Sequence, residues 1–392
     1  MDILLSMNNM LPTSLYIHVP WCIRKCPYCD FNSHQQQDTS LPEQNYLQAL
    51  LEDFAQDVAR WPRQNLHTIF IGGGTPSLLS GEFYFRLLEA IAKQVPFAPN
   101  IEITMEANPG TVEQQRFKEY RQAGINRISL GVQSFDSMHL KRLGRIHDEK
   151  QAHRAIETAR EAGFTNINID IMHNLPEQTI QEGLNDLQQA LAYQPEHLSW
   201  YEFTIEPNTY FFKHPPVLPI ESTCAAIEEQ GRALLEASGM QRYEISAYAQ
   251  SPGHISQHNM NYWLFGDYYG IGAGAHGKLS QCDCTQILRT QKHRQPRDYL
   301  NPQKQFLTTQ EAISEDDRIF EFMLNTSRLE QSIPYTLFVE RTALPLSYLE
   351  KPLHIAAKKG FVTLENNGWK VSAFGRKFTN DLQSLFLLAN QA

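Results

Sequence analysis

The chain has 392 residues, of which 42% are hydrophobic, enough for a sizeable buried core, and this excludes an intrinsically disordered protein. Its 21 glycines and 21 prolines are scattered along the chain, which excludes a fibrous repeat. A formal net charge of −9 argues against a protein that coats nucleic acid through non-specific charge, so no nucleic-acid partner is expected.

The amino-terminal segment has no basic stretch and only a few consecutive apolar residues, so we do not expect it to act as a signal peptide. No apolar run approaches the ~20 residues that span a bilayer. We therefore expect a cytoplasmic protein, in which thiols stay reduced. Three of its six cysteines fall within eight residues, and this clustering favours metal or redox chemistry over a disulfide framework.

Short segments rich in Ile, Val and Leu alternate with helical patterns over the first two-thirds of the chain. We predict strands at Leu15–Val19, Thr68–Ile71, Ile101–Glu106, Arg127–Val132, Asn166–Met172 and His197–Tyr201. Helical periodicity falls between them, near 43–60, 81–94, 111–123, 148–162 and 178–192. Strand–helix repetition predicts an α/β fold with a parallel sheet. Six units are too few for a closed barrel, which takes ~250 residues, so we expect a partial (β/α)6 barrel.

The last part of the chain has a different pattern. Residues 291–310 are polar and contain two prolines, which predicts a linker. Helical patterns near 311–326 and 345–359 precede a hairpin over 361–372 and a last helix, an order that resembles a winged helix. We predict two domains, 1–290 and 291–392.

The two predicted domains differ in charge. From Lys292 onward the chain has 13 Lys+Arg and 11 Asp+Glu, a net charge of +2, so the acidity belongs to the first domain. A net charge of +2 is weak evidence for a DNA-binding surface, so we favour a docking or lid role for the second domain.

The run Cys22-Ile-Arg-Lys-Cys26-Pro-Tyr-Cys29 directly follows the first predicted strand. Loops at the carboxyl ends of barrel strands are where active sites are built. Three closely spaced thiolates can hold three irons of a 4Fe–4S cluster and leave the fourth iron without a protein ligand. The alternative is a zinc site, which would need a fourth ligand such as His18 or His34. A second pair, Cys282 and Cys284, is spaced too tightly for one tetrahedral zinc without other ligands.

Two glycine-rich runs have different settings. Gly72-Gly-Gly-Thr-Pro76 directly follows the second predicted strand, where glycines let backbone N–H groups approach a ligand, although a triple glycine is also a common tight turn. The run over 270–277 lacks the strand–helix context of a dinucleotide motif, and we predict a loop near the barrel mouth.

The cysteine spacing resembles that of the radical S-adenosylmethionine (SAM) superfamily, in which SAM chelates the fourth iron. The aromatic Tyr28 beside the last cysteine agrees with that pattern. The resemblance implies a 4Fe–4S cluster held by Cys22, Cys26 and Cys29, with SAM as a second cofactor and the Gly72–Gly74 loop against its amino group.

Over about residues 14–280 the motifs resemble those of oxygen-independent coproporphyrinogen III oxidase and its relatives. They include Met-Glu-Ala-Asn-Pro-Gly, with Glu106, and Leu-Gly-Arg-Ile-His, with Arg145. The resemblance implies that Tyr16, Gly73 and Glu106 contact SAM. It also implies that the rest of the pocket, which holds a second SAM in the oxidase, is lined by Gly74, Thr75, Gln133, Arg145, Asp170 and Thr204. Structural ion pairs use the same charged residues, so that alternative stays open for each of them.

Two features depart from the oxidase. The oxidase has a fourth cysteine two residues after the third, where this chain has Phe31, which puts the oxidase reaction in doubt. The run His258-Asn-Met-Asn-Tyr262-Trp263 resembles the HNxxYW motif of the heme chaperone group. This resemblance implies heme binding, with His258 as a candidate axial ligand and Tyr262 and Trp263 as flat contacts. The alternative is that His258 is a hydrogen-bonded residue and Trp263 a core residue.

Two functions follow from these resemblances. The leading hypothesis is a heme chaperone that binds a 4Fe–4S cluster and SAM and passes heme to an acceptor protein, for which a respiratory cytochrome is one candidate. The alternative is radical-SAM decarboxylation of coproporphyrinogen III. We assign no catalytic residue, and peripheral membrane association and oligomeric state stay open.

Overall fold

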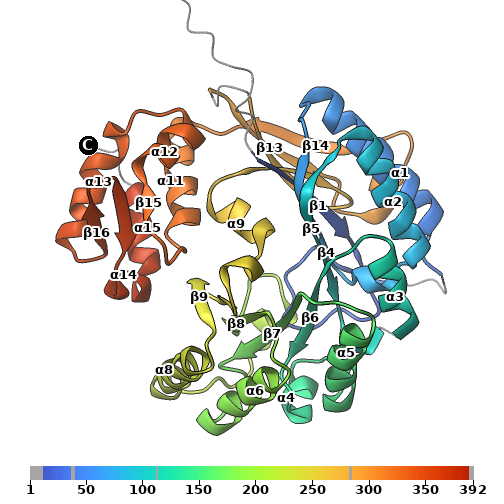
Figure 1. Cartoon of the computed structure of the whole chain (residues 1–392), viewed down its shortest axis with the longest axis horizontal. Coiled ribbons are helices and arrows are strands. Elements are labelled where there is room, and N and C mark those ends of the chain that lie inside the picture. The colour runs from blue at the N-terminus through green and yellow to red at the C-terminus, as the bar shows by residue number, and fades with distance from the viewer. Residues whose placement is uncertain (1–11, 37–39, 112–113, 282–284, 388–392) are drawn as a thin grey trace, which may run out of the picture.

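The computed structural model describes residues 12–36, 40–111, 114–281 and 285–387. The amino-terminal segment, for which we expect no signal peptide, lies outside these residues, as do Cys282 and Cys284. The largest sheet among the described residues has twelve strands in the order β14-β13-β12-β11-β1-β4-β5-β6-β7-β8-β10-β9, and it is strongly curved (Figure 1).

The centre of the sheet is parallel. It consists of β1 (Thr13–Val19), β4 (Leu66–Gly73), β5 (Phe97–Ala107), β6 (Arg127–Gln133), β7 (Ile167–His173) and β8 (His197–Glu202). These strands match the six predicted ones. All but one residue of β1 and of β7 is buried, as expected for strands covered on both faces.

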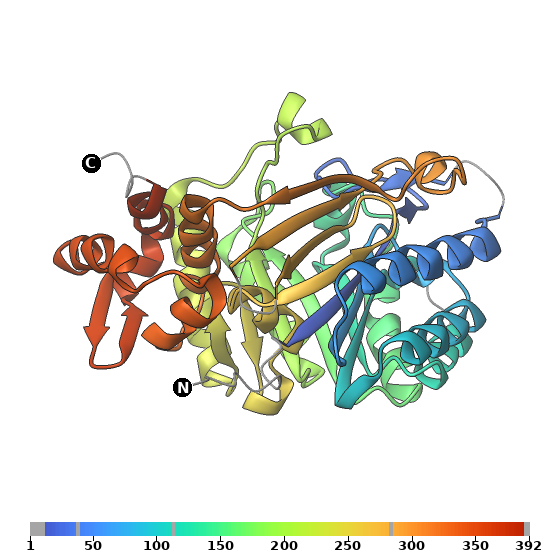
Figure 2. The same ribbon diagram turned by 90° about the horizontal axis from the view of Figure 1, so that it is seen from above.

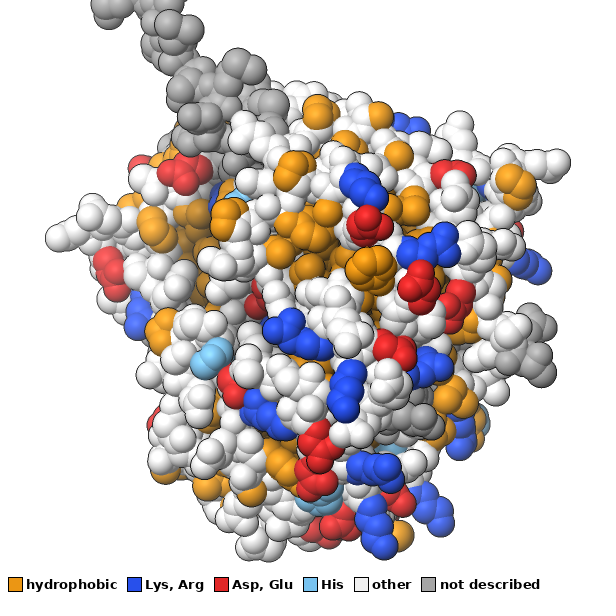
Figure 3. Space-filling model, turned by 45° about the vertical axis from the view of Figure 1, so that its right-hand side comes forward, with side chains coloured by type: hydrophobic (Ala, Val, Ile, Leu, Met, Phe, Trp, Pro, Cys, Tyr) orange, Lys and Arg blue, Asp and Glu red, His pale blue; other side chains and the backbone are white. Residues whose placement is uncertain are grey.

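Helices cover the outer face of the sheet (Figure 1). They are α1 (Glu43–Arg60), α2 (Gly81–Gln94), α3 (Gln114–Gln122), α4 (Ser137–Arg142), α5 (Glu149–Glu161), α6 (Ile180–Ala192) and α8 (Glu221–Ala237). Capping boxes stabilise the first turns of α5, at Asp148, and of α6, at Thr179. In each, the side chain of this residue accepts a hydrogen bond from the backbone N–H three residues later, and the side chain there accepts one from its backbone N–H. Acidic and basic side chains are intermixed on the side of the molecule shown in Figure 3. No helix in the described part of the chain is long and apolar enough to cross a bilayer.

Two predictions are wrong beside β1, where antiparallel strands extend the sheet. β11 (Asp267–Ile271) pairs in parallel with β1, and β12 (His276–Ser280), β13 (Ile287–Lys292) and β14 (Leu307–Ala312) follow in antiparallel order. The predicted loop over 270–277 therefore contains the end of β11 and the start of β12. The predicted linker over 291–310 contains the end of β13, the short helix α10 (Pro296–Tyr299) and the start of β14.

The opposite edge of the sheet is also antiparallel, with β10 (Ala247–Ala249) beside β8 and β9 (Gln241–Glu244) outermost. Two short helices lie outside the outer layer, α7 (Tyr210–Lys213) and α9 (Gln257–Trp263). Because β9 and β14 are the two edges and do not pair with each other, the barrel is open, as predicted.

The C-terminal part is mostly helical and lies beside one end of the sheet (Figure 2). Its elements are α11 (Glu315–Thr326), β15 (Ile333–Pro334), α12 (Tyr335–Thr342), α13 (Ser347–Lys358), β16 (Val362–Glu365), β17 (Gly368–Val371), α14 (Ala373–Lys377) and α15 (Thr379–Leu387). β16 and β17 form the predicted hairpin. Buried Trp369 and Phe322 share a core with Phe265 and Ile287 of the large-sheet part. The division at 290/291 stays a prediction.

A buried ionic cluster joins the first helix to the sheet extension. The Lys292 ammonium on β13 lies 2.8 and 2.9 Å from the two carboxylate oxygens of Asp57 and also contacts Asp53. The Asp53 carboxylate accepts a further hydrogen bond of 2.7 Å from the Tyr299 hydroxyl. All four residues are buried, so these charges depend on each other for stabilisation.

We expect Lys292→Met to lower the free energy of unfolding by about 3–5 kcal/mol, because it leaves two carboxylates buried without their cation. Urea denaturation followed by circular dichroism measures the change. Lys93→Met is the matched control, because Lys93 pairs with Glu89 at the exposed surface and should contribute at most about 1 kcal/mol. Equal effects of the two substitutions would contradict the prediction.

Candidate functional site

The loop after β1 carries the three clustered cysteines at the carboxyl edge of the parallel strands. β2 (Trp21–Cys22) and β3 (His34–Gln35) pair at the base of this loop, and the Cys29 N–H closes a turn on the Cys26 carbonyl at 3.1 Å. All three thiols are free and partly exposed. Burial raises the pKa of the Cys22 and Cys29 thiols.

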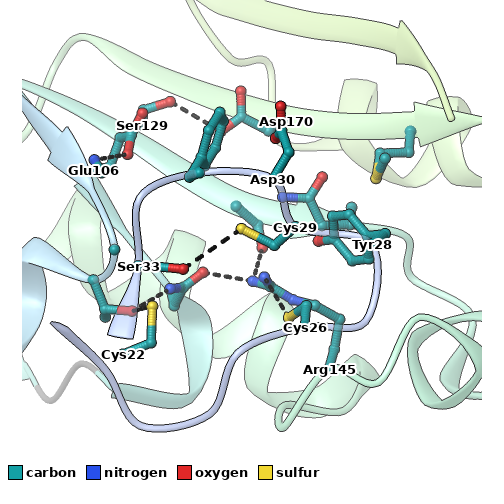
Figure 4. A pocket seen from close by; sticks show the side chains of 18 of the residues that line it. Cys22, Cys26, Tyr28, Cys29, Asp30, Ser33, Glu106, Ser129, Arg145 and Asp170 are labelled. Atoms are coloured by element: carbon teal, nitrogen blue, oxygen red, sulfur yellow. Dashed lines mark hydrogen bonds between the residues drawn. The ribbon is translucent and has the colours of Figure 1, made fainter. Parts of the chain in front are cut away.

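The cysteines line a cavity of about 430 Å³, which we call the cysteine cavity (Figure 4). Every residue predicted for the cluster and SAM lines it, apart from Tyr16. These residues are Cys22, Cys26, Tyr28, Cys29, Gly73, Gly74, Thr75, Glu106, Gln133, Arg145, Asp170 and Thr204. The structure therefore brings them together, and their roles as ligands stay predictions.

Polar side chains lie beside all three cysteine sulfurs. The Thr75 hydroxyl lies 3.4 Å from the Cys22 sulfur, the Arg145 guanidinium lies 3.8 Å from the Cys26 sulfur, and the Ser33 hydroxyl lies 3.8 Å from the Cys29 sulfur. No three His, Cys, Asp or Glu side chains in the described ranges form a single-ion site. An iron–sulfur cluster does not need such convergence, because each thiolate binds a different iron.

The glycine turn after β4 touches the cysteine loop through its backbone. The Gly74 N–H donates to the Val19 carbonyl at 2.6 Å, and the Thr75 N–H donates to the Trp21 carbonyl at 2.7 Å. A Cβ on Gly74 would lie 2.5 Å from the Trp21 carbonyl oxygen, and Gly73 has a φ of +111°. Side chains at these two positions are therefore excluded, because the glycines pack directly against β1 and the start of the cysteine loop.

Two carboxylates on parallel strands line the cysteine cavity (Figure 4). Glu106 on β5 accepts a hydrogen bond of 3.1 Å from the Gly73 N–H. Asp170 on β7 accepts hydrogen bonds from the Ser129 hydroxyl at 3.0 Å and from the Asn168 amide at 2.8 Å. Desolvation inside the cavity, followed by the nearby charge of Asp170, raises the pKa of Glu106 to about 8.

On another wall of the cavity, Arg145 and Gln133 are held by residues that the sequence interpretation missed. The Arg145 guanidinium donates to the Asn108 amide oxygen and, at 2.8 Å, to the Gly131 carbonyl. The Tyr201 hydroxyl donates to the Gln133 side-chain oxygen at 2.6 Å. Asn108 follows one predicted strand and Tyr201 ends another. Because active-site residues gather at the carboxyl edge of a parallel sheet, this position could have identified both residues from the sequence.

Tyr16 lies in an adjoining cavity of about 550 Å³, which we call the tyrosine cavity. Its lining consists of Tyr16, His18, Asn32, Tyr262, Tyr268, Gly274, His276, Gln291 and Arg294, together with Asp30, Phe31, Gly73 and Glu106, which also line the cysteine cavity. Asn32 connects the two regions, because its amide donates to the Ala273 and Arg294 carbonyls, both at 2.9 Å.

In the HNxxYW motif, His258 and Tyr262 contact each other, whereas Trp263 packs elsewhere. His258 is 1% exposed, and its ring nitrogens lie 2.8 Å from the Thr68 hydroxyl and 2.9 Å from the Tyr262 hydroxyl. Trp263 packs against the C-terminal core under the guanidinium of Arg328. Only Tyr262 reaches a cavity. His258 as a heme ligand stays a prediction, but its contacts match the hydrogen-bonded alternative.

We expect the carboxyl pKa of Glu106 in the ligand-free protein to fall when Asp170→Asn removes the neighbouring negative charge. Carbon-13 NMR of labelled carboxyl groups measures it. Asp186 is an internal control, because its pKa of about 7 arises mainly from its own burial and should not move. An unchanged Glu106 pKa would contradict the prediction.

The same shift predicts a pH dependence of stability. The folded-state pKa of Glu106 lies above the ordinary carboxyl value of 4.5, so its contribution to stability is fully present below about pH 4.5 and is lost as the pH rises through about 8. Glu106→Gln should therefore reduce the fall in unfolding free energy across this range. An identical fall in both proteins, measured by urea denaturation, would refute the assignment.

Comparison with known proteins identifies the family. Residues 16–190 match the radical SAM superfamily. The heme chaperone HemW of Escherichia coli strain K12 is 49% identical over 97% of this chain and 100% of its own length, and that of Haemophilus influenzae is 46% identical over 97% and 99%. The crystal structure of E. coli coproporphyrinogen III oxidase, a radical SAM enzyme, shares the fold with a TM-score of 0.79 at 24% identity, over 96% of this chain and 90% of that one. The chain therefore belongs to the HemW family of the radical SAM superfamily.

Proposed function

We propose that this protein is a heme chaperone that binds a 4Fe–4S cluster and SAM in the cysteine cavity and carries heme to an acceptor protein. The observation that carries the proposal is the full-length similarity to the heme chaperone of E. coli, which extends from the cysteine loop through the C-terminal part. The geometry of the cavity supports the two cofactors, as follows.

The donors of the cysteine cavity suit an iron–sulfur cluster. Cys22, Cys26 and Cys29 come from one loop, line one cavity and carry free thiols. The Arg145 guanidinium lies 3.8 Å from the Cys26 sulfur, so the cavity holds a positive charge beside one of the three sulfur donors. When bound, such a cluster supplies one-electron redox chemistry and an open iron for SAM.

The polar walls suit SAM, which carries an ammonium, a carboxylate and ribose hydroxyls. The Glu106 carboxylate can accept hydrogen bonds from the ammonium or from ribose hydroxyls, and the turn at Gly73 and Gly74 lines the same cavity. Gln133 and Arg145 are fixed by Tyr201 and Asn108, so this wall is preorganised before any ligand enters.

Phe31 supports carriage of heme over decarboxylation of a porphyrinogen. It occupies the position of the oxidase's fourth cysteine, and a phenyl ring neither ligates iron nor reacts as a thiol. Its side chain is 59% exposed and lies where the two cavities meet, so it offers an apolar contact surface.

We expect Cys22→Ala, Cys26→Ala and Cys29→Ala each to abolish the brown absorbance and the bound iron of the anaerobically reconstituted protein. Iron analysis and visible spectroscopy measure both. Cys224→Ala is the matched control, because this free thiol lies on α8 and does not line the cavity. Unchanged iron content in all three variants would refute the ligand assignment.

The carrier function has its own test. We expect the wild-type protein to bind heme, with a shifted Soret band, and to form no protoporphyrinogen when incubated anaerobically with SAM, a reductant and coproporphyrinogen III. Formation of protoporphyrinogen together with 5′-deoxyadenosine would overturn the carrier-only function, and absence of heme binding would overturn the chaperone assignment.

A further inference from the structure

The tyrosine cavity is large enough for a ligand and adjoins the cysteine cavity. Its volume of about 550 Å³ lies within the range of pockets that hold cofactor-sized molecules. It is bounded by β1, by the antiparallel extension β11–β13 and by α9. Four residues form the boundary with the cysteine cavity, so a ligand here would adjoin the cluster loop.

Aromatic rings form much of the tyrosine cavity. The rings of Tyr262 and Tyr268 meet edge to face, with centroids 4.5 Å apart, and Tyr16 and Phe31 add two more rings. The Tyr268 hydroxyl accepts a hydrogen bond of 2.8 Å from Arg289, which fixes its ring. Rigid aromatic walls favour a flat apolar ligand, because such rings contribute large contact areas at low conformational cost.

His276, the first residue of β12, gives this cavity a nitrogen ligand for iron. Its side chain is exposed, and its imidazole makes no hydrogen bond within the described residues. Desolvation, with the charges of Arg289 and Arg294, lowers its pKa, which favours the neutral ring that binds metals. The other histidine of the cavity, His18, is already bonded through both ring nitrogens, to the Tyr16 hydroxyl and the Asn32 carbonyl.

Arg294, just after β13, gives the cavity a cation. Its side chain is exposed, and no carboxylate among the described residues pairs with it. A guanidinium free of ion pairs is suited to a carboxylate, which it can bind through two parallel hydrogen bonds. Asp30 and Glu106 line both the tyrosine cavity and the cysteine cavity. His276 and Arg294 line the tyrosine cavity but not the cysteine cavity.

We propose that the tyrosine cavity is the heme-binding site, with His276 as an axial ligand of the iron and Arg294 as the partner of a propionate. This inference rests on the proposed carrier function and names its site. His276 is accessible from outside, as a ligand must be when cargo is loaded and released, whereas His258 would have to break two buried hydrogen bonds.

The test is a titration of the full-length protein with hemin, followed by the Soret band and by electron paramagnetic resonance of the ferric iron. We expect His276→Ala to weaken heme affinity by roughly tenfold or more, and Arg294→Glu to weaken it as well. His276→Tyr should replace the nitrogen signature with that of a phenolate, which a merely structural role would not produce. His67→Ala, an exposed histidine on β4 outside both cavities, is the control and should bind like the wild type.

The outcomes separate the two proposals. If the wild type binds no heme, the carrier function fails. If the wild type binds heme and both His276 variants keep its affinity and ligand signature, the site assignment is overturned while the carrier function stands. Loss of heme in His258→Ala alone, with bound iron and circular dichroism unchanged, would also overturn the assignment to His276.

Discussion

Both cavities depend on strand β1, which pairs in parallel with β4 on one side and with β11 on the other. This pairing brings the cysteine loop after Val19 against the glycine turn after β4. Alternation along the strand sends Tyr16 and His18 to one face and Leu15, Ile17 and Val19 to the other. A register shift of one residue would turn Tyr16 and His18 into the apolar core and the apolar residues toward the cavities. Burial of the apolar face of β1 therefore fixes the position of Tyr16 and His18.

The parallel half of the fold was predictable, because strands buried on both faces appear as short apolar runs and their helices carry the matching periodicity. The extension β11–β14 was not. β11 pairs with β1, which lies far earlier in the chain, and a local sequence pattern cannot predict pairing between such distant segments. The segment over 291–310 was predicted to be a linker because it is polar and contains two prolines. Its Lys292 is buried instead, because its partners Asp53 and Asp57 lie on a helix far away in the sequence.

The candidate site shows the same division. Its ligand-type residues were found through motifs, and the structure gathers nearly all of them in one cavity. Their supports were missed, because Asn108 and Tyr201 act through Arg145 and Gln133 and carry no motif chemistry themselves. The motif also could not reveal how deeply His258 is buried, because that burial depends on β4 and α9 packing together. Exposure and hydrogen-bond satisfaction of a histidine are properties of the tertiary structure.

Asn32 stands on the cysteine loop, yet its amide bonds to the backbone on both sides of the β12–β13 hairpin, and its close approach leaves no room for a side chain at Gly274. These two hydrogen bonds therefore fasten the cysteine loop to the wall that carries His276. A contact of this kind acts in both directions, so a change in the position of either region is felt by the other. The side-chain amide of Asn32 thus joins the walls of the two neighbouring cavities.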